Sequence, residues 1–202
     1  ISIDLSHNPN IRIVSNEHDL DRILKVMSIN VELEYIYLRN VSVDLIDSIK
    51  LSRFIFVEDF DLSSNNFNWS QSISLRNFDY VFRIYLDNTN LDKIEPQSFL
   101  NKKNMETLDL SNNQFNRVLF NDSINFKSLI YLILKNVSLS QIDDNLNLSH
   151  LKFLAYLDMS LNQLKFISSN YFSSNQKLYY LNISFNRLEY IEAKSFVKDS
   201  LK

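Results

Sequence analysis

Apolar residues recur along the chain in a fixed frame of eleven positions. Residues 105–115 (METLDLSNNQF) have apolar side chains at the first, fourth, sixth and eleventh positions and asparagine at the ninth. The same frame fits residues 33–43, 57–67, 81–91, 129–139, 154–164 and 178–188, with a shortened copy at 3–8. Successive ninth positions are 24 or 25 residues apart after a first step of 33. Self-similarity at this period predicts a solenoid of stacked repeats.

Each copy of the frame predicts one short strand followed by a turn. The fourth and sixth positions share a face of the strand because side chains alternate, and stacking the copies in parallel builds a continuous apolar interior. The asparagine falls in the turn, where its amide can pair with backbone groups. Valine replaces it at Val41 and Val137. Valine cannot donate such a bond, so we expect a local rearrangement or an ordered water at these two turns.

The return segments between the predicted strands carry a second pattern. Isoleucine and phenylalanine are five residues apart in 94–99, 167–172 and 191–196. Stacked phenylalanines would form a spine beneath the convex side. Where the pattern lapses, we expect Ile124 or Phe126 to substitute after residue 115, and Leu146 and Leu148 to do so in the repeat with one extra residue.

On these motifs the chain resembles the leucine-rich-repeat family over essentially its whole length. The step of 24 residues and the isoleucine–phenylalanine pairs resemble the typical class of repeat in Toll-type receptor ectodomains and related cell-surface proteins. The resemblance implies an α/β horseshoe solenoid. About eight parallel strands would line its concave side, and mostly coil or 3₁₀ turns its convex side.

One longer helix is expected inside this array. Residues 17–28 (EHDLDRILKVMS) place apolar side chains at helical spacing. The stripe favours packing on the convex side, and a protruding recognition helix is the alternative. We treat residues 1–202 as a single array. The flanking caps that the resemblance implies are missing, so we expect an interior fragment of a longer ectodomain.

Composition argues against several functions. The chain has no cysteine and no glycine, which rules out disulfides, a thiol nucleophile and a glycine-rich phosphate loop. Its histidines, His7, His18 and His150, are far apart in the repeat frame, so no catalytic grouping emerges. We therefore predict no enzymatic activity, no cofactor and no metal. A calcium site formed by Asp61, Asp87 and Asp109 across neighbouring strands is a less favoured alternative.

Charge and hydropathy limit the possible partners. The net charge of −3 disfavours general binding to nucleic acid or anionic membranes. No run of 18 uninterrupted apolar residues is present, so any membrane attachment would need segments outside this sequence. Protein partners, or further copies of the chain, are the remaining expectation.

The frame also predicts a binding surface. Its third, fifth, seventh and eighth positions would face outward on or beside the concave sheet. The candidate ligand-binding residues are Tyr35, Tyr37, Asp59, Asp61, Arg83, Tyr85, Asp87, Asp109, Tyr131, Tyr156, Leu161, Tyr180 and Phe185. Exposed aromatic side chains with a polar tip commonly anchor protein interfaces. Alternatively, the tyrosines only stack across strands, the aspartates are only solvated, and Arg83 only neutralises its neighbours.

Six N-glycosylation sequons are present, at Asn40, Asn68, Asn121, Asn136, Asn147 and Asn182. The frame places three of them on convex coils, Asn40 and Asn136 at the rim, and Asn182 in the middle of the concave face. A glycan on Asn182 would shift binding toward Tyr35, Tyr37 and Tyr85. Together with the resemblance, these features favour a protein-binding module of an extracellular receptor or adhesion protein. The alternatives are a spacer or homotypic scaffold and, less favoured, an intracellular adaptor.

Overall fold

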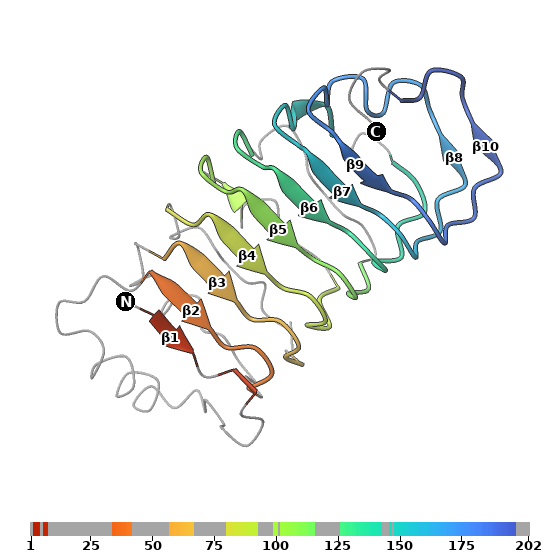
Figure 1. The fold of residues 1–202 in the computed structure, drawn as a ribbon. Helices are drawn as coiled ribbons and strands as arrows, with labels where there is room; N and C mark the ends of the chain where they lie inside the picture. The colour runs from red at the N-terminus through yellow and green to blue at the C-terminus, as the bar shows by residue number, and fades with distance from the viewer. Residues whose placement is uncertain are drawn as a thin grey trace.

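The strands form a parallel sheet in chain order (Figure 1). The computed structural model describes residues 2–4, 6–7, 34–41, 57–66, 80–92, 99–100, 102–115, 126–142, 146 and 148–196. Within these residues the main sheet has eight strands in the order β1-β2-β3-β4-β5-β6-β7-β9. Their bounds are β1 Ser2–Asp4, β2 Tyr35–Tyr37, β3 Asp59–Asp61, β4 Arg83–Tyr85, β5 Thr107–Asp109, β6 Tyr131–Ile133, β7 Tyr156–Asp158 and β9 Tyr180–Asn182.

The return segments contain little regular structure in the described residues. A 3₁₀ helix, η2, covers Leu148–His150. The strands β8 (Phe166–Ile167) and β10 (Tyr190–Ile191) pair in parallel as a second, two-stranded sheet beside the last turns (Figure 1). The parallel-strand solenoid predicted from the repeat is therefore confirmed. The helix expected over residues 17–28 lies outside the described residues.

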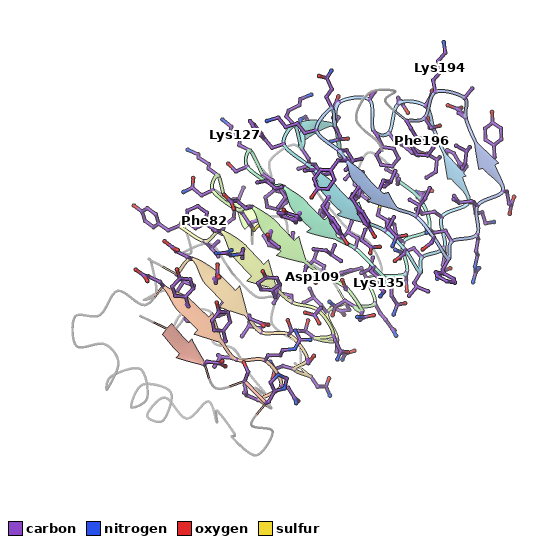
Figure 2. All side chains as sticks on the ribbon, viewed as in Figure 1. Phe82, Asp109, Lys127, Lys135, Lys194 and Phe196 are labelled. Atoms are coloured by element: carbon purple, nitrogen blue, oxygen red, sulfur yellow. The ribbon has the colours of Figure 1, made fainter. Side chains whose placement is uncertain are left out.

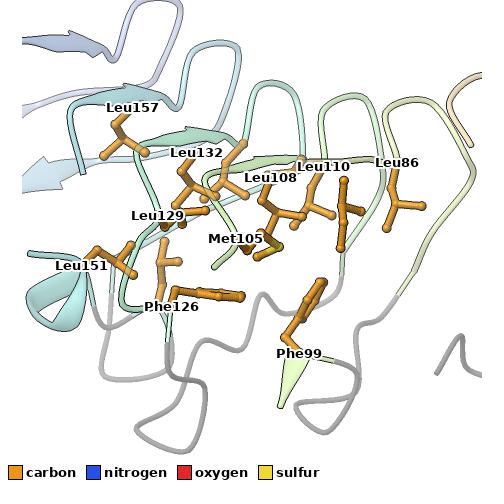
Figure 3. Packing of buried hydrophobic residues seen from close by; sticks show 14 of the residues in the cluster. Leu86, Phe99, Met105, Leu108, Leu110, Phe126, Leu129, Leu132, Leu151 and Leu157 are labelled. Carbon is orange, nitrogen blue, oxygen red and sulfur yellow. The ribbon is translucent and has the colours of Figure 1, made fainter. Parts of the chain in front are cut away.

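The apolar positions of the frame form one continuous core. Residues at the first, fourth and sixth positions of the central repeats are buried, as Met105, Leu108 and Leu110 illustrate with no exposed surface. Figure 3 shows equivalent side chains on successive coils, among them Leu108, Leu132 and Leu157, gathered on one side of the strands. Because every strand faces an equivalent strand in the next repeat, each buried side chain has a counterpart on either side.

A phenylalanine spine closes the convex side of the core. Phe99 packs edge-on against Phe126, with ring centroids 5.5 Å apart, and Phe172 stacks on Phe196 at 6.2 Å. Phe126 is buried and thus fills the place left by the missing phenylalanine, whereas Ile124 lies outside the described residues. Leu146 and Leu148 are also buried, as the pattern predicted.

In the described residues, each ninth-position asparagine joins the turns of two repeats. The side-chain amide nitrogen of Asn113 donates to the carbonyl oxygens of Leu86 (2.7 Å) and Leu110 (2.8 Å). Its Oδ1 accepts the backbone N–H of Thr89 (3.1 Å) and of Leu91 (2.8 Å). One buried side chain therefore forms hydrogen bonds with these four backbone groups of two repeats.

In the turns with valine, the valine N–H donates to the side-chain oxygen of the asparagine in the following repeat. The N–H of Val41 donates to Asn65 Oδ1 at 2.9 Å, and that of Val137 donates to Asn162 Oδ1 at 3.0 Å. The residue after Val137, Ser138, has a φ of 62°. This extra left-handed residue is the local rearrangement expected at Val137. The residue after Val41 lies outside the described residues.

Candidate functional site: the concave face

The sheet register places the third and fifth positions of the frame in two straight rows. The third-position row is Tyr35, Asp59, Arg83, Thr107, Tyr131, Tyr156 and Tyr180. The fifth-position row is Tyr37, Asp61, Tyr85, Asp109, Ile133, Asp158 and Asn182. The structure therefore brings the sequence-predicted concave residues together across the sheet, with the side chains drawn in Figure 2.

Asp59 lies in the third-position row of the concave face, but neighbouring side chains cover it. Its Oδ1 accepts a 2.6 Å hydrogen bond from Arg83 Nε, and its Oδ2 accepts the Tyr37 hydroxyl at 3.2 Å. Only 6% of Asp59 is exposed. The predicted neutralisation by Arg83 is thus a direct ion pair, which also raises the pKa of the arginine.

Further polar and charged side chains of the N-terminal half pair with one another. Arg39 reaches across an intervening repeat to Asp87, 3.4 Å from its carboxylate, and the small Ser63 occupies the seventh position between them. Tyr35 donates to Glu58 at 3.4 Å. The negative charge of Glu58 is the main reason that the pKa of Tyr35 is raised. Partial burial, followed by the nearby carboxylates, raises the pKa of Tyr85.

The fifth-position aspartates serve their own turns. Oδ1 of Asp61 accepts the backbone N–H of Ser63 at 2.8 Å, and Oδ1 of Asp109 accepts that of Ser111 at 2.9 Å. Asn182 makes the same contact with Ser184. Such side-chain caps fix the chain as it leaves the strand. These carboxylates therefore stabilise the turns that follow their strands, in addition to any contact that they make with solvent.

Replacement of Asp109 by asparagine tests this structural role. Burial raises the pKa of the Asp109 carboxyl above 3.8, with the Ser111 hydrogen bonds opposing the shift. Asparagine keeps the acceptor and removes the buried charge, so Asp109→Asn should be at least as stable as wild type at pH 7. The folded wild type takes up a proton on this carboxyl more readily than the unfolded chain does. The stability of wild type relative to the variant should therefore rise as pH falls through the raised pKa, and the rise should be complete below pH 3.8.

Urea unfolding between pH 7 and pH 3 measures this difference. The control is Asp109→Leu, which loses the acceptor and should cost about 1 kcal/mol. A stability gap between wild type and Asp109→Asn that does not change with pH would contradict the assigned burial.

The C-terminal half presents a row of tyrosines. Tyr156 and Tyr180 stack in parallel with ring centroids 4.2 Å apart, and Tyr131 lies 5.9 Å from Tyr156 at a tilt. Tyr131 and Tyr180 are exposed to 40% and 39%. Partial burial between its neighbours, followed by the Tyr180 hydroxyl, raises the pKa of Tyr156 to about 12. The predicted stacking and the predicted exposure therefore occur together.

Two bulky apolar residues lie at the rim beside this row. The eighth position of the frame has a positive φ in every described repeat, a conformation that suits asparagine. Leu161 and Phe185 occupy it with φ of 57° and 54°, and Phe185 is 79% exposed. Holding such side chains in this conformation costs on the order of 1 kcal/mol each. Neither core packing nor turn geometry accounts for them.

The sequon asparagines divide into three groups. Asn40 and Asn136 are exposed at the rim. Asn182 lies on β9, where its amide donates to Asp158 Oδ2 at 3.2 Å. Asn68, Asn121 and Asn147 lie outside the described residues.

The structure adds residues that the repeat frame did not single out. Tyr179 precedes β9 and is 53% exposed. A hydrogen bond with Tyr131 raises the pKa of its hydroxyl, which joins it to the tyrosine row. Lys177 lies over the ring of Phe153, with Nζ 4.0 Å from the centroid. Both contacts join residues of different repeats and involve positions that the frame does not constrain. The only signal in the sequence was an aromatic residue at such an unconstrained position.

Metal and membrane sites were also considered. Across the described ranges, no group of three or more His, Cys, Asp or Glu side chains is placed to hold a metal ion. The calcium alternative at Asp61, Asp87 and Asp109 fails because two of these carboxylates cap their own turns and Asp87 pairs with Arg39. In the same part of the chain, no helix is long and apolar enough to cross a membrane.

Comparisons with known proteins identify the fold. No protein-family model and no curated protein sequence match the chain. Its structure is similar to that of the LRIM1/APL1C complex (TM-score 0.64, 23% identity, 84% of this chain and 29% of the other). It is also similar to the TLR13–ssRNA13 complex (TM-score 0.62, 21% identity, 84% of this chain and 27% of the other). A third similar structure is the Drosophila Toll–Spatzle complex (TM-score 0.63, 20% identity, 84% of this chain and 26% of the other).

The chain spans less than a third of the length of each of these three chains. All three are leucine-rich-repeat proteins. At this level of identity the similarity bears on the fold alone, and it agrees with the repeat frame, the parallel register and the asparagine-linked turns. The chain is therefore a leucine-rich-repeat solenoid.

Proposed function

We propose that this chain is a non-catalytic recognition module that binds a protein partner through its concave face, as part of an extracellular receptor or adhesion protein. The observation that carries the proposal is the row of Tyr131, Tyr156 and Tyr180 on neighbouring strands, with Tyr131 and Tyr180 exposed and Tyr156 partly buried between them. Two similar structures are complexes between proteins, LRIM1/APL1C and Toll–Spatzle. The exposed sequon asparagines Asn40 and Asn136 are compatible with an extracellular setting.

The mechanism is docking onto preorganised side chains. The rings of Tyr156 and Tyr180 already stack on each other, so a partner need not order them on binding. Leu161 and Phe185 extend the row with apolar surface at the rim. Large aromatic side chains within a polar surround are the usual energetic centres of protein interfaces.

The N-terminal half of the face would contribute selectivity. Asp61, Asp87 and Asp109 keep carboxylate oxygens on the concave side, and Tyr35, Tyr37, Arg83 and Tyr85 surround them. Carboxylates outnumber cations here, which favours a partner with basic side chains and disfavours polyanions. A nucleic-acid partner, as in the TLR13 complex, is therefore less suited to this surface.

The experiment compares tyrosines of similar exposure inside and outside the proposed site. The chain would be screened against a panel of purified extracellular proteins, and Kd measured by surface plasmon resonance for every binder. The double variant Tyr131→Ala/Tyr180→Ala should weaken binding about 30-fold or more, since interface anchors contribute about 2 kcal/mol or more. Tyr190→Ala, on β10 and 60% exposed, is the matched control and should bind as wild type. Equal affinities for all three chains would refute the concave-face proposal.

A second candidate function, homotypic assembly, rests on a different surface. Phe166, Tyr190 and Ile191 on β8 and β10 are exposed to 43%, 60% and 45%. An apolar flank of this kind would suit contact with another copy of the chain. Sedimentation velocity separates the candidates. Assembly would give a concentration-dependent dimer that Tyr190→Ala weakens and Tyr180→Ala leaves unchanged.

A further inference from the structure

A polar hollow lies away from the tyrosine row, where the chain turns after β3, β4 and β5. Its volume is about 500 Å³, within the usual range of roughly 300–1,000 Å³ for ligand pockets. Three consecutive repeats line it with their eighth, ninth or tenth positions. Among the described residues, the lining is Ser64, Asn65, Asn66, Asn88, Asn90, Asn112, Asn113 and Gln114.

The chemistry of this lining is uniform. Every lining side chain is an amide or a hydroxyl, so the hollow offers mainly paired donors and acceptors, without charged groups or aromatic rings. Side chains of Asn66, Asn88, Asn90 and Gln114 are exposed and make no hydrogen bond with any residue that the structure describes. Their amides are available to an incoming ligand.

The backbone holds these amides in fixed positions. Asn65 and Asn113 are buried and clamp the turns beneath the hollow through the hydrogen bonds of their side chains. Asn88, Asn90 and Asn112 have φ of 53°, 58° and 55°, the left-handed conformation in which asparagine is among the few favoured residues. Repetition of the turn at each repeat sets the amides in a row, which reduces the ordering cost of binding.

We propose that this hollow is a binding site for a neutral, hydroxyl-rich ligand, namely an oligosaccharide. A sugar hydroxyl both donates and accepts, which matches the two functions of a side-chain amide. A peptide segment would require aromatic or large apolar side chains to hold its anchors, and none of the lining residues has such a side chain. An ionic ligand would find no counter-charge there. The site is separate from the concave tyrosines and does not rest on their function.

The test uses the full chain and a panel of neutral trisaccharides: maltotriose, cellotriose, mannotriose and triacetylchitotriose. Binding is followed by NMR through the side-chain amide signals of the asparagines and Gln114. At least one trisaccharide should give saturable shifts of the lining amides. Asn88→Gly/Asn90→Gly should raise its Kd at least about tenfold through the loss of several hydrogen bonds. Glycine tolerates positive φ, so the turns should keep their shape.

Asn40→Gly is the matched control. Asn40 has the same eighth position in the frame as Asn88 and a φ of 54°, but it does not line the hollow. The Kd of the Asn40→Gly variant for the trisaccharide should therefore equal that of wild type. Tyr131→Ala/Tyr180→Ala should also bind the trisaccharide normally, which separates this site from the proposed protein site. The proposal is overturned if no trisaccharide gives saturable shifts, or if both glycine variants weaken binding equally. Shifts produced only by an uncharged Gly-Ser hexapeptide, or centred on the concave tyrosines, would overturn it as well.

Discussion

Replacing Asn113 by valine should lower the free energy of unfolding by about 3–5 kcal/mol. The change leaves the carbonyl of Leu110 and the N–H groups of Thr89 and Leu91 without their hydrogen-bond partner in the interior. An unpaired buried backbone group costs about 1–3 kcal/mol. The loss falls on two repeats at once because the side chain joins them.

The control for this change is Thr89→Val at the equivalent position of the preceding repeat. The Thr89 hydroxyl donates to the carbonyl of Leu86, which also receives a bond from Asn113. Removing that hydroxyl should therefore cost about 1 kcal/mol or less. Urea unfolding followed by circular dichroism measures both values. Similar losses for the two variants would show that the asparagine does not act as the clamp between repeats.

Replacing Phe99 by alanine should cost about 3–5 kcal/mol. Phe99 is 1% exposed and packs edge-on against Phe126 at the convex edge of the core, where Figure 3 shows the two rings next to each other. Removing the ring opens a cavity between consecutive return segments, and the flanking coils can close it only in part. Thermal unfolding should report a large fall in Tm relative to wild type.

Phe185→Ala provides the same chemical change at a side chain that is 79% exposed. Its effect on stability should stay within about 0.5 kcal/mol. If the two variants melted together, the spine would not contribute to the core in the way the burial of Phe99 implies.

The repeat period was enough to predict the parallel sheet and the rows of its concave face. A constant step forces equivalent residues into register, so Tyr131, Tyr156 and Tyr180 had to be neighbours once the copies stacked. The sequence also limited the residue that fills the spine after residue 115 to Ile124 or Phe126, because the spine needs one large apolar side chain in each repeat.

The sequence could not predict which concave residues remain available to a partner. Asp59 is paired with Arg83 and covered by its neighbours, and Arg39 pairs with Asp87 across a whole intervening repeat. Such pairings depend on side-chain length and on the size of the residue between, which the frame does not encode. The amide hollow was missed for a similar reason, since each of its asparagines also reads as an ordinary turn residue.

The shared clamps limit how such an array can lengthen. A turn containing valine, as at Val41 or Val137, takes its hydrogen-bond acceptor from the repeat that follows. A copy of this kind can be added only together with a neighbour that carries asparagine. A turn with asparagine has the same need, since the N–H of Leu164 in the Asn162 turn donates to Asn186 Oδ1 of the next repeat. A valine copy offers no such acceptor to the repeat before it, so two valine copies in succession would leave a buried backbone N–H without its partner.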